Sequence, residues 1–208
     1  GQYSPTSEQG KVTKSTPQGS LDYAFNPVSV ALGAEATFVA RAIDSDRKHL
    51  TEVLRATAAH EGSALVEIYQ NCNIFNDGAF EPLKEHGVRE DHLIRLEHGQ
   101  PIIFGNNHEK CVIRDSDGHL QVVNVEDVDQ SEVIIFDSHA KDPGLAFGLS
   151  RLYNPRTLTN TPIGIFRDVT HREAYDRMAQ QQIADVIESE GPGDLRSLLH
   201  GSDTWTIN

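Results

Sequence analysis

The chain has 208 residues, a mean hydropathy of -0.44 and a formal charge of -13, from 18 Lys plus Arg against 31 Asp plus Glu. This length allows one large domain or two small ones, and no apolar run reaches the roughly 18 residues of a transmembrane helix. The acidic balance argues against a nucleic-acid-binding surface, which needs clustered cations. It is compatible with a basic protein partner or simply with solubility.

The chain contains two cysteines, Cys72 and Cys111. Two thiols can neither build a disulfide framework nor cage a metal ion by themselves, so a reducing, cytoplasmic location fits best. The sequence has no secretion signal, and it begins at Gly1 instead of a methionine. We therefore expect an internal fragment or a trimmed product.

A loop comes first along the chain, because residues 1–20 are rich in Gly, Ser, Thr, Pro and Gln and show no hydrophobic period. Backbone amides and hydroxyl groups in such a loop can bind phosphate, although the P-loop motif is absent. Asn26 and Pro27 are typical of a helix start, and they predict a short helix directly after this loop.

A strand–helix–strand unit is predicted next, with strands at 37–43 and 64–69 and a helix at 46–59. The helix carries an apolar stripe at helical spacing. Two strands joined by one helix over this length form a right-handed βαβ unit, so we expect a parallel sheet.

The second of these strands, 64–69, is a nearly unbroken apolar run, which is typical of a strand buried on both faces. It stops abruptly at the polar stretch 70–73, and open α/β sheets bind ligands at the carboxyl ends of such strands. Cys72 lies there, as a candidate ligand or nucleophile. The alternative is a packed thiol, and the spacing by itself favours packing.

Shorter elements follow residue 77. The predicted strands are 93–96, 102–104, 111–114, 119–125, 132–136 and 162–166, and the predicted helices are 79–86, 143–152, 174–188 and 195–199. Ser116-Asp117-Gly118 indicates a β-hairpin between two of the strands, and Cys111 is expected to pack within the first of them.

Two groups of reactive residue types are better explained by structure than by chemistry. The ten histidines show no HExxH motif and no spacing typical of a zinc site. Asp137, Ser138 and His139 have the residue types of a catalytic triad, but sequence neighbours rarely form one.

Four stretches carry a resemblance to a known family: GlyGlnTyrSerProThrSer at 1–7, AlaThrPheValAlaArg at 36–41, GlnAsnCysAsnIlePheAsnAsp at 70–77 and ThrProIleGlyIlePheArg at 161–167. Along most of its length the chain resembles the β subunit of 2-oxoacid:ferredoxin oxidoreductases, particularly those acting on 2-oxoglutarate. The stretch 70–77 is the most specific of the four.

The resemblance implies that Cys72 ligates a [4Fe–4S] cluster, which reverses the interpretation from spacing alone. The other three ligands, and the motif that holds thiamine diphosphate and Mg²⁺, would precede this sequence. Gln2 would lie beside the cofactor's diphosphate, together with residues 4–7. Cys111 matches no cluster position, and no catalytic residue is expected in this chain.

The implied fold is α/β, with part of a parallel sheet of the thiamine-diphosphate-binding type at 1–77 and a C-terminal α+β extension, containing the hairpin, at 78–208. The implied reaction is oxidative decarboxylation of a 2-oxoacid with coenzyme A, with an α subunit and ferredoxin as partners and no role for nucleic acid or membrane. Two alternatives stay open: a thiamine-diphosphate enzyme without iron–sulfur chemistry, and a non-catalytic acidic interaction domain.

Overall fold

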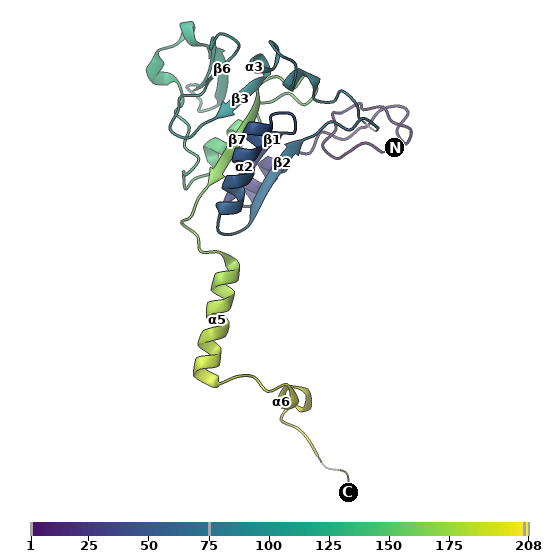
Figure 1. Ribbon diagram of the computed structural model, residues 1–208, viewed down its shortest axis with the longest axis vertical. Coiled ribbons are helices and arrows are strands. Elements are labelled where there is room, and N and C mark those ends of the chain that lie inside the picture. The colour runs from purple at the N-terminus through teal and green to yellow at the C-terminus, as the bar shows by residue number, and fades with distance from the viewer. Residues whose placement is uncertain (1, 75, 206, 208) are drawn as a thin grey trace. The chain divides into compact units, whose positions relative to one another are not determined.

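The computed structural model describes residues 2–74, 76–205 and 207 (Figure 1). Gly1 and Phe75, which belong to two of the family-like stretches, lie outside the described residues, as do Thr206 and Asn208. The chain divides into two compact units, Gly1–Arg172 and Glu173–Asn208.

The main sheet of the first unit has four strands in the order β2-β1-β7-β3. Strand β1 (Phe38–Ile43) pairs in parallel with β2 (Ala64–Tyr69), and β3 (Leu93–Leu96) pairs in parallel with β7 (Thr161–Asp168). The central pair, β1 and β7, is antiparallel. The predicted parallel βαβ unit is confirmed, and it belongs to a mixed sheet that also contains strands from beyond residue 77. The domain boundary expected at that residue stays a prediction.

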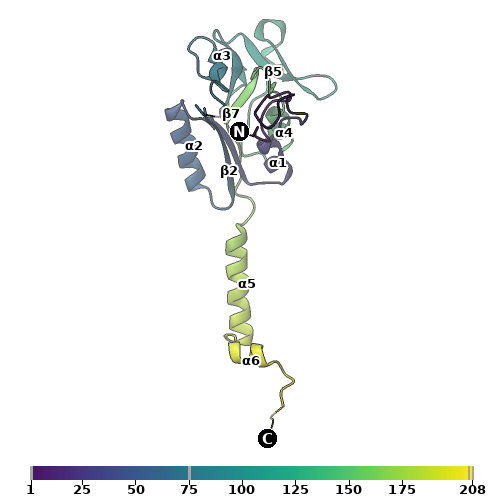
Figure 2. The same cartoon turned by 90° about the vertical axis from the view of Figure 1, so that its right-hand side faces the viewer.

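Helices cover both faces of this sheet (Figure 2). Helix α2 (Arg47–Ala59) packs its buried Val53 against side chains of β1. Helices α1 (Pro27–Gly33) and α4 (Gly144–Ser150) contact each other and cover the opposite face, where they form the larger apolar core. Helix α1 begins as predicted, because the Asn26 side chain accepts a hydrogen bond from the Ser29 amide at 3.0 Å.

Strand β2 corrects one expectation. Every residue of β1 is buried, whereas only Tyr69 of β2 is, and Ile68 is 41% exposed. The physical reason is position: β2 is the outermost strand of the sheet, and within the described residues one of its edges has no neighbouring strand. The apolar run indicated a strand correctly, but the prediction of burial on both faces was wrong.

A smaller antiparallel sheet lies next along the chain. It contains β4 (Ile103–Phe104), β5 (Lys110–Arg114) and β6 (Leu120–Asn124), in that order. Gly118, with φ +86°, turns the chain between β5 and β6, and Asp115 accepts hydrogen bonds from two amides of this turn. Three short elements border the sheets: α3 (Arg89–His92) and the 3₁₀ turns η1 (Glu81–Leu83) and η2 (Val125–Asp127).

Two short segments differ from their predictions. The helix expected at 79–86 is reduced to the single turn η1. The strand expected at 132–136 is replaced by a 3₁₀ turn, η3 (Gln130–Glu132), and by isolated bridges at Val133 and Ile135. Both segments are too short for a hydrophobic period to distinguish a turn from a regular element.

The second unit contains α5 (Tyr175–Glu190) and α6 (Leu195–His200), close to the predicted helices. Asp194 caps α6 by accepting hydrogen bonds from the amides of Arg196 and Ser197. Apolar side chains of α5 stay exposed: Tyr175, Met178, Ile183, Val186 and Ile187. In the parts of the chain that the structure describes, no helix has both the length and the apolar character that crossing a bilayer requires.

Candidate functional site

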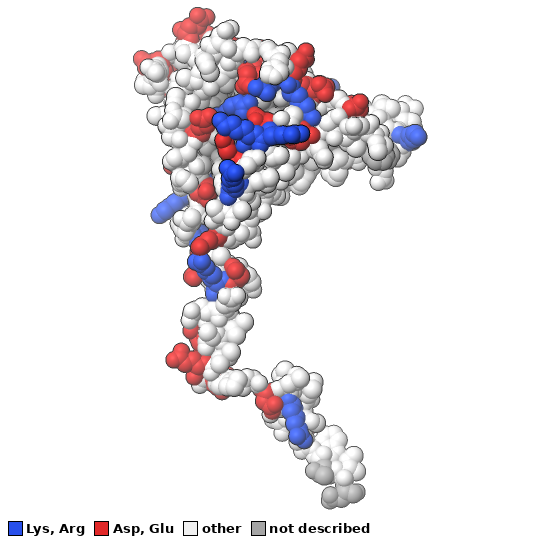
Figure 3. All heavy atoms as spheres, in the orientation of Figure 1, with Lys and Arg blue, Asp and Glu red and all other residues white. Residues whose placement is uncertain are grey.

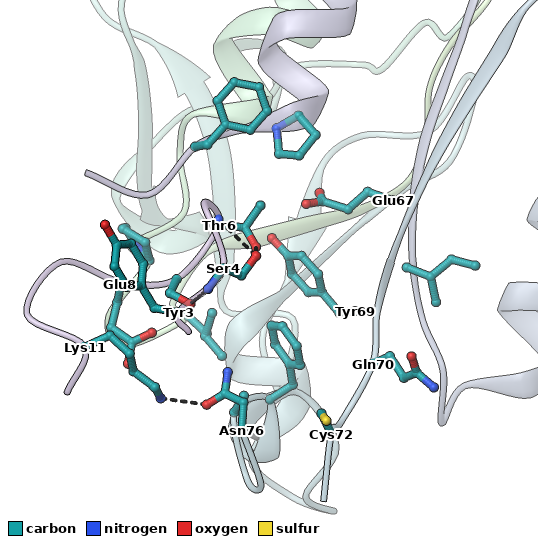
Figure 4. Close-up of a pocket in the computed structure, with 18 of the residues that line it drawn as sticks. Tyr3, Ser4, Thr6, Glu8, Lys11, Glu67, Tyr69, Gln70, Cys72 and Asn76 are labelled. Carbon is teal, nitrogen blue, oxygen red and sulfur yellow. Dashed lines mark hydrogen bonds and ion pairs between the residues drawn. The ribbon is translucent and has the colours of Figure 1, made fainter. Parts of the chain in front are cut away.

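A cleft of about 520 Å³ lies beside the edge strand β2 (Figure 4). It is lined by residues of the opening segment from Gln2 to Thr13, by β2 and the turn after it from Glu67 to Phe80, and by Tyr153, Pro155 and Leu158. Gln2 and Cys72, the two predicted site residues, therefore line the same cleft although they are far apart in sequence.

The turn that carries Cys72 is held by hydrogen bonds at both ends. The Asn76 amide donates to the Cys72 carbonyl at 2.9 Å. The Asn71 side chain donates to Asp77 at 2.8 Å and accepts from the Gly78 amide at 2.9 Å. Cys72 itself is exposed. Its thiol is thus presented on a constrained turn, as a ligand position requires.

Cys111 occupies the opposite environment. It is 0% exposed within β5, and burial raises the pKa of its thiol. A protonated, buried thiol is neither a good metal ligand nor a good nucleophile. The expectation that Cys111 packs within a strand is confirmed.

The opening segment is folded back on itself by its hydroxyl groups. The Ser4 amide donates to the Ser7 hydroxyl at 3.1 Å, and the Ser7 amide donates to the Ser4 carbonyl at 2.9 Å. The hydroxyls of Ser4 and Thr6 lie 2.9 Å apart. Ser4, Thr6 and Ser7 all line the cleft, so its wall next to Gln2 is rich in hydroxyl and amide groups.

A buried cation lies behind the other wall of the cleft. The Arg41 side chain is fully buried, and its Nε donates to the Glu67 carboxylate at 2.7 Å. Its guanidinium also lies 5.2 Å from the ring of Tyr69 and 5.1 Å from that of Tyr153. Among the described residues, no partner is found for Arg41 Nη2. Glu67 and both tyrosines line the cleft, so Arg41 sets the charge and orientation of that wall.

The two tyrosines of this wall stay protonated. Burial raises the pKa of the Tyr69 and Tyr153 phenols, and it outweighs the opposing effect of the Arg41 charge. Tyr69 also stacks on Phe80, with ring centroids 4.5 Å apart. This wall thus offers neutral hydroxyl groups and one carboxylate.

The sequence reading missed the ion pair between Arg41 and Glu67. The predicted strands indicate this pair only to within one position, because Arg41 is the fifth residue of 37–43 and Glu67 the fourth of 64–69. In the observed strands both are the fourth residue, and parallel pairing brings them into register. Charges at matching positions of neighbouring strands indicate a cross-strand pair.

The structure also places the histidines and the Asp137–His139 stretch that were considered from the sequence. In the described part of the chain, no group of three or more His, Cys, Asp and Glu side chains is placed to hold a metal ion. Asp137 and Ser138 both approach the same ring nitrogen of His98, at 3.2 and 3.4 Å. A catalytic triad uses both ring nitrogens of its histidine, so this arrangement is not one.

Comparison with known proteins shows which proteins the chain is similar to. The chain is 55% identical, over its full length, to the 2-oxoglutarate oxidoreductase subunit KorB of Mycobacterium tuberculosis. The chain is a relative of the β subunits of 2-oxoacid:ferredoxin oxidoreductases. It spans 55% of the length of that relative. No family model matches the chain.

Other β subunits of 2-oxoacid:ferredoxin oxidoreductases match a shorter stretch. Those of a Sulfolobus species and of Aeropyrum pernix are 40% and 43% identical over 77 residues, which is 37% of this chain and about a quarter of each relative. The 2-oxoglutarate:ferredoxin oxidoreductase of Magnetococcus marinus, solved with 2-oxoglutarate, coenzyme A and succinyl-CoA bound, is 21% identical with a TM-score of 0.59. That match covers 98% of this chain and 53% of the solved one, and it shows a shared mixed α/β fold.

Proposed function

We propose that this chain is the C-terminal part of the β subunit of a 2-oxoglutarate:ferredoxin oxidoreductase that acts in the cytoplasm together with an α subunit. The reaction converts a 2-oxoacid and coenzyme A to an acyl-CoA and CO₂, and the two electrons released reduce two molecules of ferredoxin, one electron each. The identity of 55% over the whole chain supports the family. The observation that carries the proposal is the cleft that places Cys72 next to the opening segment.

Cys72 fits one ligand position of a [4Fe–4S] cluster, because its exposed thiol follows the end of a strand on a turn fixed by hydrogen bonds. Such a cluster takes four thiolates and supplies one-electron transfer when it is bound. Cys111 is sealed within β5, so the other three ligands must come from outside this sequence. Asn71, whose side chain closes the turn, positions the thiol.

The opening segment fits the diphosphate of thiamine diphosphate, because the hydroxyl-bearing residues Ser4, Thr6 and Ser7 line the cleft together with Gln2. When bound, thiamine diphosphate would supply a nucleophilic carbon for chemistry at the keto group of a 2-oxoacid. Gln2 is assigned to binding the cofactor through its side-chain amide. The motif for Mg²⁺ is expected outside this sequence, so this chain binds and orients but carries no catalytic residue of its own.

The acidic interaction domain is the weaker alternative. On the face shown in Figure 3, Lys and Arg side chains lie among Asp and Glu side chains. Arg95 pairs with Asp46 at 3.1 Å and with Glu90 at 3.3 Å, and Lys84 pairs with Asp44 at 3.0 Å. This face is therefore of mixed charge and does not present a single-sign surface to a basic partner.

Substitution Cys72→Ser in the complete, anaerobically purified enzyme tests the proposal. We expect a large loss of cluster iron and of the electron paramagnetic resonance (EPR) signal, and loss of ferredoxin reduction, because a serine oxygen is a poor substitute for a cluster thiolate. Cys111→Ser is the matched control and should keep wild-type iron content. Normal iron and full ferredoxin reduction in Cys72→Ser would refute Cys72 as a ligand. Absence of cluster absorption in the intact, anaerobic wild-type enzyme would instead favour a thiamine-diphosphate enzyme without iron–sulfur chemistry.

A further inference from the structure

Lys11, in the opening segment, places its ammonium group against the turn that carries Cys72. Lys11 Nζ donates a hydrogen bond to Asn76 Oδ1 at 2.6 Å, across 65 residues of sequence. Lys11, Asn76 and Cys72 all line the cleft, and Figure 4 shows Asn76 between Lys11 and Cys72. The Lys11 side chain is 26% exposed, so it is only partly solvated.

Hydrogen bonds hold both ends of this link between Lys11 and the Cys72 turn. At one end, Asn76 forms a bridge with Cys72, in which the Asn76 amide donates to the Cys72 carbonyl at 2.9 Å. At the other end, the Lys11 backbone exchanges hydrogen bonds with Ser20 at 3.0 and 3.1 Å. A freely moving surface lysine would average its field over many positions, whereas these contacts hold the ammonium group in one place.

We propose that Lys11 sets the reduction potential of the iron–sulfur centre that Cys72 ligates, an inference that rests on the function proposed above. Reduction adds one electron, and so one negative charge, to such a centre without making or breaking a bond. In the proposed reaction the 2-oxoacid donates that electron and ferredoxin accepts it. A fixed cation stabilises the more negative, reduced state and raises the potential.

Glu8 opposes the effect of Lys11 on the reduction potential, so substitution of Glu8 is a second test. Its carboxylate lies 3.2 Å from Lys11 Nζ and also lines the cleft. The Glu8 charge partly cancels the field of Lys11, so its removal should act in the opposite direction to removal of Lys11.

The test is an anaerobic redox titration of the complete holoenzyme, followed by EPR of the reduced cluster. Lys11→Gln should lower the ratio of reduced to oxidised cluster at a fixed potential by about tenfold, which is about 59 mV for a one-electron couple. Lys11→Arg keeps the charge and should stay near the wild-type potential. Lys14→Gln is the matched control, because Lys14 is exposed and does not line the cleft.

Glu8→Gln should raise the potential, and it keeps the inference testable if Lys11→Gln fails to assemble a cluster. Equal potentials for Lys11→Gln and Lys14→Gln, or an unchanged potential in Glu8→Gln, would overturn the role of Lys11 and leave the proposed function untouched. Absence of any EPR signal that depends on Cys72 would instead remove the proposed function, so the two failures can be told apart.

Discussion

Strands β1 and β2 run side by side in the same sheet, but β1 belongs to the buried core and β2 borders the cleft. Strand β1 lies at the sheet interior, and all six of its residues are buried. Strand β2 forms the edge, most of its residues are partly or fully exposed, and Glu67 to Gln70 line the cleft. The comparison shows that position in the sheet, more than the apolar character of the strand, decides which residues are free to bind.

The strongest link between the interior and the edge is the pair of Arg41 on β1 and Glu67 on β2. Glu67→Ala leaves the fully buried Arg41 charge without its carboxylate, and we expect it to lower the free energy of unfolding by about 3–5 kcal/mol. Chemical denaturation measures this loss. Glu67→Gln keeps a hydrogen-bond acceptor and should cost less. Equal, small effects of both changes would mean that the interior does not depend on the edge.

The two cysteines repeat the contrast between interior and edge. Cys111→Ser places a hydroxyl at a position that is 0% exposed, and we expect it to cost about 1–3 kcal/mol of stability through an unsatisfied polar group. Thermal unfolding checks the loss, and iron analysis of the complete enzyme should show no change. Loss of iron in this variant would mean that the interior thiol, and not the one at the cleft, is the ligand.

Sequence patterns were enough for the elements of the interior. The Asn26 cap, the strand before residue 44 and the helix after it follow from local propensity, and the structure confirms them. Local propensity could not predict the order of the strands in the sheet. Nothing within 64–69 reveals that β7, almost a hundred residues later, takes the central position and leaves β2 at the edge.

The cleft was only partly predictable for the same reason. Cys72 and Gln2 were singled out through the family resemblance, and the structure places both at one cleft. The bond between Lys11 and Asn76 joins residues 65 positions apart, in segments with no regular period, so no local pattern points to it. The pairing of Arg41 with Glu67 was predictable only to within one position, because the predicted strand 37–43 begins one residue before the observed strand.

The residues that follow the carboxyl ends of β1 and β2 also differ in role. After β1, Asp46 caps α2 by accepting a hydrogen bond from the His49 amide at 3.3 Å, and it pairs with Arg95 at 3.1 Å. Burial raises the pKa of Asp46, but these two contacts lower it more, so the net pKa lies below its ordinary value. The end of β1 thus supports the fold, whereas the end of β2 carries the cleft.

Asp46→Ala should cost about 1 kcal/mol of stability at pH 7 through loss of the cap. A carboxyl group whose pKa is lower in the folded state stabilises the protein above its unfolded pKa of about 3.9, and this contribution disappears as the pH falls through the folded value. Asp46→Asn keeps a capping side chain, so its deficit should be smaller and should vanish in acid. Unfolding measured from pH 7 down to pH 2 checks both; a deficit that grows in acid would contradict the assignment.

Cys72→Ser should have the smallest effect on stability, even though the largest effect on function is expected from it. The 208-residue chain holds two cysteines, too few for a complete cluster, so its unfolding reports on packing alone. Because Cys72 is exposed on its turn, we expect a change within about 0.5 kcal/mol, against the larger cost of Cys111→Ser. A loss of stability as large as that of Cys111→Ser would show that Cys72 is a packed thiol, like Cys111, and not a thiol presented at the cleft.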